Sequence, residues 1–134
     1  MKKIALIGSN YYPEITSGLS NTFLKLCRDS NWHVDEFMVY GVSEMPLKFK
    51  SLALLNEYDG IAVLGCVVKG ETYHNSLINS YVFNKIYDLS LEYMIPLGYG
   101  ILNVKSYDDA VARSLLNKNN RGIEVFESLE LAVV

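Results

Sequence analysis

Short apolar runs alternate along the chain with longer segments in which apolar residues recur every three or four positions. A short apolar run that ends in a turn is typical of a strand buried on both faces, whereas spacings of three and four are typical of an amphipathic helix. The pattern predicts four strands, at 3–8, 33–40, 59–65 and 95–102. It predicts five helices, at 14–30, 46–55, 77–93, 108–116 and 122–133.

This regular alternation of strands and helices predicts the fold class. Right-handed strand-helix-strand crossovers produce an α/β fold in three layers, with a four-stranded parallel sheet covered by helices on both faces. No linker or internal repeat divides the sequence, so one domain spanning residues 1–134 is expected. Ligands bind beyond the carboxyl ends of the strands in such sheets, which directs attention to the loops at 9–13, 40–46, 66–75 and 103–106.

Composition narrows the classes of partner. Half of the 134 residues are hydrophobic and 20% are charged, which excludes a disordered or low-complexity chain. The 15 acidic and 12 basic residues give a net charge of -3, which disfavours nucleic acid as a partner. No apolar run approaches the roughly 20 residues of a membrane span, so no membrane partner is expected and a cytoplasmic location is predicted. Cys27 and Cys66 form no CxxC pair and are predicted to be free thiols.

The segment after the third predicted strand carries the densest candidate chemistry. Gly70, Thr72 and His74 stand immediately before a predicted helix. Free amides at a helix start attract a phosphate, the Thr72 hydroxyl adds a donor, and the His74 imidazole can move protons beside it. The same spacing also suits an N-cap at Thr72 and a solvated His74 with no ligand at all.

Four further residues are candidates, and each has a structural alternative. Tyr11 follows the first predicted strand, where its ring can cover a planar heterocycle or pack against the next loop. Glu44 can accept hydrogen bonds from a ligand or stabilise the dipole of the helix that follows it. Arg113 and Arg121 can bind an anion together or remain solvated.

In their order along the chain, these segments resemble the lumazine synthase family. The resemblance covers about residues 3–132, and its most specific parts are Gly-Val-Ser-Glu-Met-Pro at 41–46 and Gly-Glu-Thr-Tyr-His at 70–74, with Arg113 and Asn-Arg-Gly at 120–122 near the end. The resemblance implies a transferase that condenses two small molecules, 5-amino-6-(D-ribitylamino)uracil and 3,4-dihydroxy-2-butanone 4-phosphate. The products would be 6,7-dimethyl-8-ribityllumazine, phosphate and water, in the penultimate step of riboflavin biosynthesis and with no metal or cofactor.

The resemblance also implies roles for particular residues. Those expected to bind the aminouracil are Tyr11, which would stack on its ring, and Val42, Ser43, Glu44, Cys66, Val67 and Val68. Those expected to bind the butanone phosphate are Glu71, Thr72, Arg113 and Arg121, while His74 is the expected proton donor and acceptor. The family's active site lies between neighbouring subunits of a homopentamer, and some pentamers pack into sixty-subunit shells. Tyr99 is therefore expected to reach the aminouracil bound by a neighbour.

Some positions depart from the family, and other functions remain open. Tyr11, Ser43, Lys69 and Asn75 stand where the family commonly has Phe or Trp, Phe, Arg and an aromatic residue. A flavodoxin-like module that binds FMN or a similar phosphorylated heterocycle without turnover would explain the aromatic residue and the phosphate loop, but not the order of the other candidates. A receiver-like signalling domain would need an acidic cluster after the first strand, and a purely structural shell protein is the third alternative.

Overall fold

The computed structural model describes residues 1–70 and 75–133. In this part of the chain the strands form a parallel sheet in the order β2-β1-β3-β4, which confirms the predicted four-stranded fold. The strands are β1 Lys3–Ser9, β2 His33–Val39, β3 Gly60–Val68 and β4 Leu97–Val104. The helices are α1 Pro13–Asp29, the 3₁₀ helix η1 Val42–Glu44, α2 Met45–Leu55, α3 Asn75–Tyr93, α4 Tyr107–Ala112 and α5 Arg121–Ala132.

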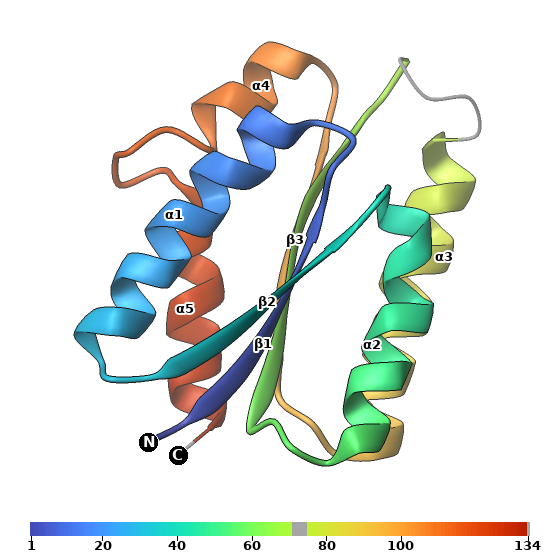
Figure 1. The fold of residues 1–134 in the computed structure, drawn as a ribbon. Helices are drawn as coiled ribbons and strands as arrows, with labels where there is room; N and C mark the ends of the chain where they lie inside the picture. Colours follow the sequence, from blue (N-terminus) through green and yellow to red (C-terminus); the bar gives the residue numbers. More distant parts are fainter. Residues whose placement is uncertain (71–74, 134) are drawn as a thin grey trace.

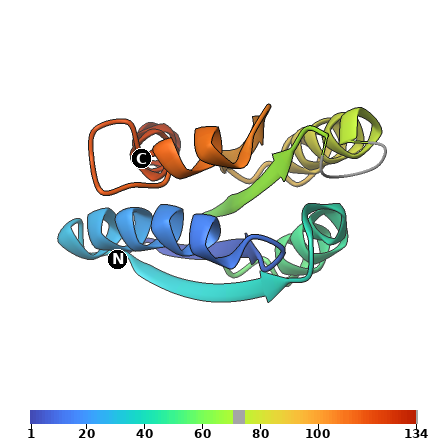
Figure 2. The ribbon, with the colours of Figure 1, turned by 90° about the horizontal axis from the view of Figure 1, so that it is seen from above.

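Helices cover both faces of the sheet, as the three-layer prediction requires. Helices α1, α4 and α5 lie on one face, and α2 and α3 lie on the other (Figure 1). Figure 2, seen from above, shows the sheet between these two helical layers. The buried apolar side chains form two clusters accordingly, one beneath α1 and α5 and one beneath α2 and α3. Both chain ends lie at the edge opposite the carboxyl ends of the strands, which leaves that carboxyl edge for a site.

Strand β3 is central, and all nine of its residues are buried. Its side chains alternate between the two clusters: Leu64 and Cys66 face α1 and α5, while Val63 and Val67 face α2 and α3. We expected the strand to end at residue 65, but this prediction was wrong. Strand β4 continues alongside it as far as the pair Val68–Val104, so residues 66–68 belong to the ladder and not to the following loop.

Three other elements, α3, β4 and α4, differ from their predicted bounds by two residues or more, and α3 begins at Asn75 instead of at residue 77. Strand β4 covers Leu97–Val104 instead of 95–102, because a positive φ at Met94 turns the chain first and pairing with β3 then carries the strand two residues further. Helix α4 ends at Ala112, four residues before the predicted end. Asparagine side chains in the following segment bond to nearby backbone groups and so compete with helical hydrogen bonding.

Cys27 and Cys66 are buried and are not joined in a disulfide, as the sequence predicted. Burial raises the pKa of the Cys27 thiol to about 12, so this group stays protonated and unreactive at neutral pH. Within residues 1–70 and 75–133, no cluster of three His, Cys, Asp or Glu side chains is arranged to hold a metal ion. In the same residues, no helix has both the length and the apolar character needed to cross a membrane.

Candidate active site

A pocket of about 220 Å³ lies at the carboxyl ends of β1, β2 and β3. It is open to solvent and lies on the side of the sheet covered by α2 and α3. Six residues that the family resemblance assigned to the aminouracil line it, and three others join them. The lining residues are Tyr11, Tyr40, Gly41, Val42, Ser43, Glu44, Cys66, Val67 and Ile78. The fold therefore brings together segments that are up to 67 positions apart in the sequence.

One wall of the pocket is aromatic. Tyr11 follows β1 and is half exposed, and its ring meets Tyr12 edge to face at a centroid distance of 5.0 Å. The ring of Tyr40, which follows β2, lies 6.2 Å from that of Tyr11 at an interplanar angle of 77°. A backbone hydrogen bond from Asn10 to the carbonyl of Val39, 2.9 Å long, holds the two strand ends side by side. The two tyrosines thus keep a fixed separation at the mouth of the pocket.

A second wall is the turn that contains η1. The Gly41 amide donates a 2.9 Å hydrogen bond to Glu44 Oε1, and the Glu44 amide donates one of 3.1 Å to the Gly41 carbonyl. These reciprocal bonds close the turn and fix the Glu44 carboxylate at the mouth. Val42 points into the core, whereas Ser43 and Glu44 remain exposed to the pocket. The turn therefore offers a hydroxyl and a carboxylate to a polyhydroxylated ligand.

The end of β3 forms the floor together with Ile78 of α3. Val67 faces the pocket side of the sheet and is buried. The side chain of Cys66 belongs to the opposite core cluster, so its main chain is what the pocket meets. Val68 also faces the opposite cluster and is not among the pocket's lining residues. Backbone groups at the end of a buried strand are well placed to bind a flat heterocycle by its edge.

Three predicted residues lie outside the described part of the chain. Glu71, Thr72 and His74 fall in the segment 71–74, between the end of β3 and the start of α3. The roles expected for them in phosphate binding and proton transfer therefore remain predictions. Asn75, the first residue of α3, is described and buried.

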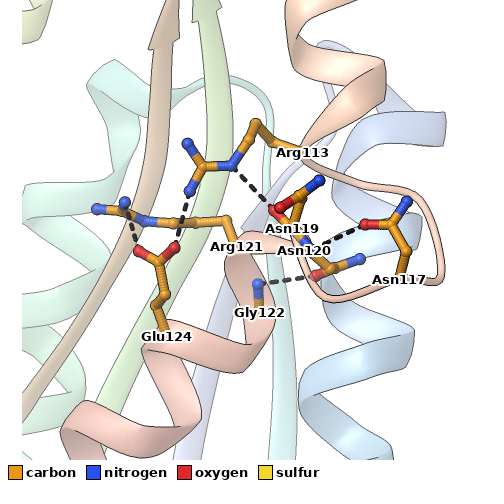
Figure 3. A network of polar contacts seen from close by, with 7 residues as sticks. All are labelled: Arg113, Asn117, Asn119, Asn120, Arg121, Gly122 and Glu124. Atoms are coloured by element: carbon orange, nitrogen blue, oxygen red, sulfur yellow. Dashed lines mark hydrogen bonds and ion pairs between the residues drawn. The ribbon is translucent and has the colours of Figure 1, made fainter.

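The two predicted arginines share one carboxylate on the other side of the sheet (Figure 3). Arg113 Nη2 lies 2.9 Å from Glu124 Oε1, and Arg121 Nη1 lies 2.7 Å from Glu124 Oε2. Arg113 Nε also donates to the Asn119 carbonyl at 2.9 Å. Neither arginine lines the aromatic pocket; Arg113 and Lys118 line a separate cavity of about 330 Å³. Two guanidinium groups on one carboxylate leave a net positive charge, which suits an anion.

Glu124 was not among the predicted site residues. Its spacing of three from Arg121, within one turn of a helix, was the available signal, because such a pair lies on one helix face. The same spacing is common in solvated ion pairs, and the contact with Arg113, which follows the end of α4, distinguishes this one.

Tyr99 lies on the edge strand β4, on the face covered by α3, and does not line the pocket. Its ring centroid is 5.3 Å from that of Phe83 and 5.4 Å from that of Tyr87. The hydroxyl is buried without a hydrogen-bond partner among the described residues. Burial holds the pKa of this hydroxyl above its usual range; Tyr87 adds to the effect, and the charge of Arg121 opposes it.

Comparison with known proteins gives a consistent answer. The family model described as 6,7-dimethyl-8-ribityllumazine synthase matches residues 1–132. A protein of that name from Leuconostoc mesenteroides is 33% identical over 132 residues, covering 96% of this chain and 84% of the relative. The one from Wigglesworthia glossinidia brevipalpis is 30% identical over 137 residues, covering 96% and 89%. The one from Limosilactobacillus reuteri is 39% identical over 97 residues, covering 72% and 64%.

Proposed function

The chain belongs to the 6,7-dimethyl-8-ribityllumazine synthase family, a family of transferases in riboflavin biosynthesis, and we propose that its pocket binds the substrates of that reaction. The substrates are 5-amino-6-(D-ribitylamino)uracil and 3,4-dihydroxy-2-butanone 4-phosphate, and the products are 6,7-dimethyl-8-ribityllumazine, phosphate and water. One observation carries the assignment of the pocket: six residues from three separate segments at the carboxyl ends of β1, β2 and β3, all expected to bind the aminouracil, line one cavity.

The pocket offers different chemistry to the two ends of the aminouracil. The ring of Tyr11 stacks on the pyrimidine, and the main chain of Cys66 and Val67 hydrogen-bonds to its edge. The ribityl chain lies along the turn, where the Glu44 carboxylate accepts hydrogen bonds from its hydroxyls and Ser43 supplies another polar contact. A flat apolar end and a polyhydroxylated end match a pocket with one aromatic wall and one polar wall.

The second substrate requires an anion site and a proton carrier. Arg113 and Arg121 bind its phosphate, together with the Thr72 hydroxyl and the amides of Glu71 and Thr72. The amine of the aminouracil attacks the ketone to form an imine and release water. Phosphate then leaves by elimination, and the resulting enol becomes a second carbonyl group. The ribitylamino nitrogen attacks that carbonyl carbon and closes the second ring, releasing a second water. His74 carries the protons that these steps release and consume, because an imidazole titrates near neutral pH.

We propose that the complete site forms between two copies of the chain. Members of this family form oligomers, and in a single chain the arginines and Tyr99 lie apart from the aromatic pocket. Tyr99 lies on β4, the edge strand of the sheet, in ring contact with Phe83 and Tyr87 of α3. Tyr81 and Leu91 of the same helix are also exposed. In a homopentamer this edge of one subunit meets the pocket of the next. A sixty-subunit shell would add contacts between pentamers, and a cytoplasmic location accompanies this function.

The test is to mix the purified protein with both substrates. Lumazine and phosphate should appear in equal amounts, and native mass measurement should show a pentamer or a multiple of it. A dissociated monomer should be inactive, because its pocket lacks the neighbour's groups. Tight binding of FMN with no lumazine formed would instead favour a flavodoxin-like binding module.

A further inference from the structure

Tyr40 lies at the pocket mouth, between the end of β2 and the Gly41–Glu44 turn. It lies between the last residue of β2, Val39, whose carbonyl is tied to β1, and Gly41, which begins the closed turn. Both neighbours make backbone hydrogen bonds, so the direction in which the Cα–Cβ bond of Tyr40 leaves the chain is set by the backbone. The ring is 73% exposed, yet it lines the pocket and contacts the ring of Tyr11.

We propose that Tyr40 is a further substrate-binding residue, which contacts the heterocyclic ring of the aminouracil together with Tyr11. The proposal rests on the proposed function, because the ligand is the aminouracil of that reaction. Tyr40 is distinct from the residues that the resemblance assigned to this ring.

The angle between the two tyrosine rings defines how they would share a ligand. At 77° they form a corner and not a parallel clamp. A planar ring seated in such a corner lies against the face of one tyrosine and meets the edge of the other, and both arrangements are favourable for aromatic groups. The Gly41–Glu44 turn has no aromatic side chain, so Tyr40 supplies the aromatic surface on that side of the pocket.

Tyr40 also has little role in holding the fold together. A tyrosine that is 73% exposed buries little apolar area, and it belongs to neither core cluster. Loss of its ring is therefore expected to leave the protein folded, so that changes in substrate binding report on the pocket.

The experiment compares Tyr40→Ala, Tyr40→Phe and the wild-type protein. Leu131→Ala serves as a control, because Leu131 is 80% exposed and lies at the far end of α5 from the pocket. We expect Tyr40→Ala to raise the KM for the aminouracil, and the Kd for the lumazine product measured by calorimetry, by about tenfold. The KM for the butanone phosphate should stay within about twofold. Tyr40→Phe, which keeps the ring, and Leu131→Ala should match the wild type.

Two results would overturn the proposal. One is an aminouracil KM and a product Kd in Tyr40→Ala that stay within about twofold of wild type. The other is an altered native mass with equal loss of both substrates, which would make Tyr40 a subunit contact. A wild-type protein that forms no lumazine would contradict the proposed function. A wild-type protein that also fails to bind the lumazine product would contradict the role of Tyr40 as well.

Discussion

Asn120 is a buried side chain that joins several elements, and its replacement should destabilise the fold much more than replacement of an exposed asparagine. Only 1% of it is exposed, and its side chain makes three hydrogen bonds. Its Oδ1 accepts from the Gly122 amide at 2.8 Å and so caps α5, while its Nδ2 donates to the carbonyls of Gly18 at 3.2 Å and Leu115 at 2.9 Å. One amide therefore joins α1, the loop that carries Leu115, and the start of α5.

We expect Asn120→Ala to lower the free energy of unfolding by about 3 kcal/mol, at about 1 kcal/mol for each lost hydrogen bond. For a chain of this length that corresponds to a fall in Tm of roughly 10 °C. Asn120→Asp should cost at least as much, because its carboxylate would face two carbonyl oxygens. Asn117→Ala is the matched control: Asn117 is exposed and its side chain accepts only from the Asn119 amide, so its loss should cost less than about 1 kcal/mol.

Urea denaturation at one fixed protein concentration measures these differences, because stability depends on concentration in an oligomer. An unfolding free energy of Asn120→Ala within about 1 kcal/mol of wild type would contradict this role of Asn120, as would equal destabilisation by Asn117→Ala.

Three further changes test other parts of the molecule. Tyr58→Phe removes a 2.8 Å bond to Asp35, the largest cause of that carboxyl's lowered pKa; it should cost roughly 1 kcal/mol in urea denaturation at neutral pH. A carboxyl whose pKa is lowered by folding stabilises the fold fully at pH values above its pKa in the unfolded state. The difference in unfolding free energy between Tyr58→Phe and wild type should therefore vanish as the pH falls through the folded-state pKa of Asp35. Gly100→Ala places a Cβ 2.6 Å from a methyl carbon of buried Val125, so it should destabilise by about 2 kcal/mol, measured in the same way. His74→Ala should slow turnover by a factor of about 10² to 10⁴ without abolishing it, and unchanged steady-state rates would remove His74 from the mechanism.

The apolar pattern alone predicted the sheet and its helices, because a buried parallel strand needs an apolar run on both faces. The apolar pattern gave the wrong strand end where hydrogen bonding to a neighbouring strand decides how long the strand is. Gly65 looked like the end of a strand, yet the ladder continues beside β4 as far as Val68. A glycine ends a strand only where no neighbouring strand holds the backbone, and that neighbour is more than 30 positions away in the sequence.

In the site, too, some residues could be predicted from the sequence and others could not. The family resemblance assigned Tyr11, Glu44 and Val67 to one substrate site. The rule that the carboxyl ends of parallel strands meet at one edge predicted that the segments at the ends of β1, β2 and β3 lie together there. Ile78 and Glu124 could not be predicted in this way. Ile78 reaches the pocket through the packing of α3 beside the turn, and Glu124 joins two arginines that local spacing does not bring together.

The sequence by itself determined the layers, the order of the elements and the residue types available at the carboxyl edge, because these depend on local periodicity and on the handedness of crossovers. The tertiary structure decided which of those residues share a cavity and which are tied up with each other. It showed that the aromatic wall and the paired arginines lie apart in one chain. Distances between side chains from different helices and strands depend on how whole elements pack, and no short stretch of sequence encodes that packing.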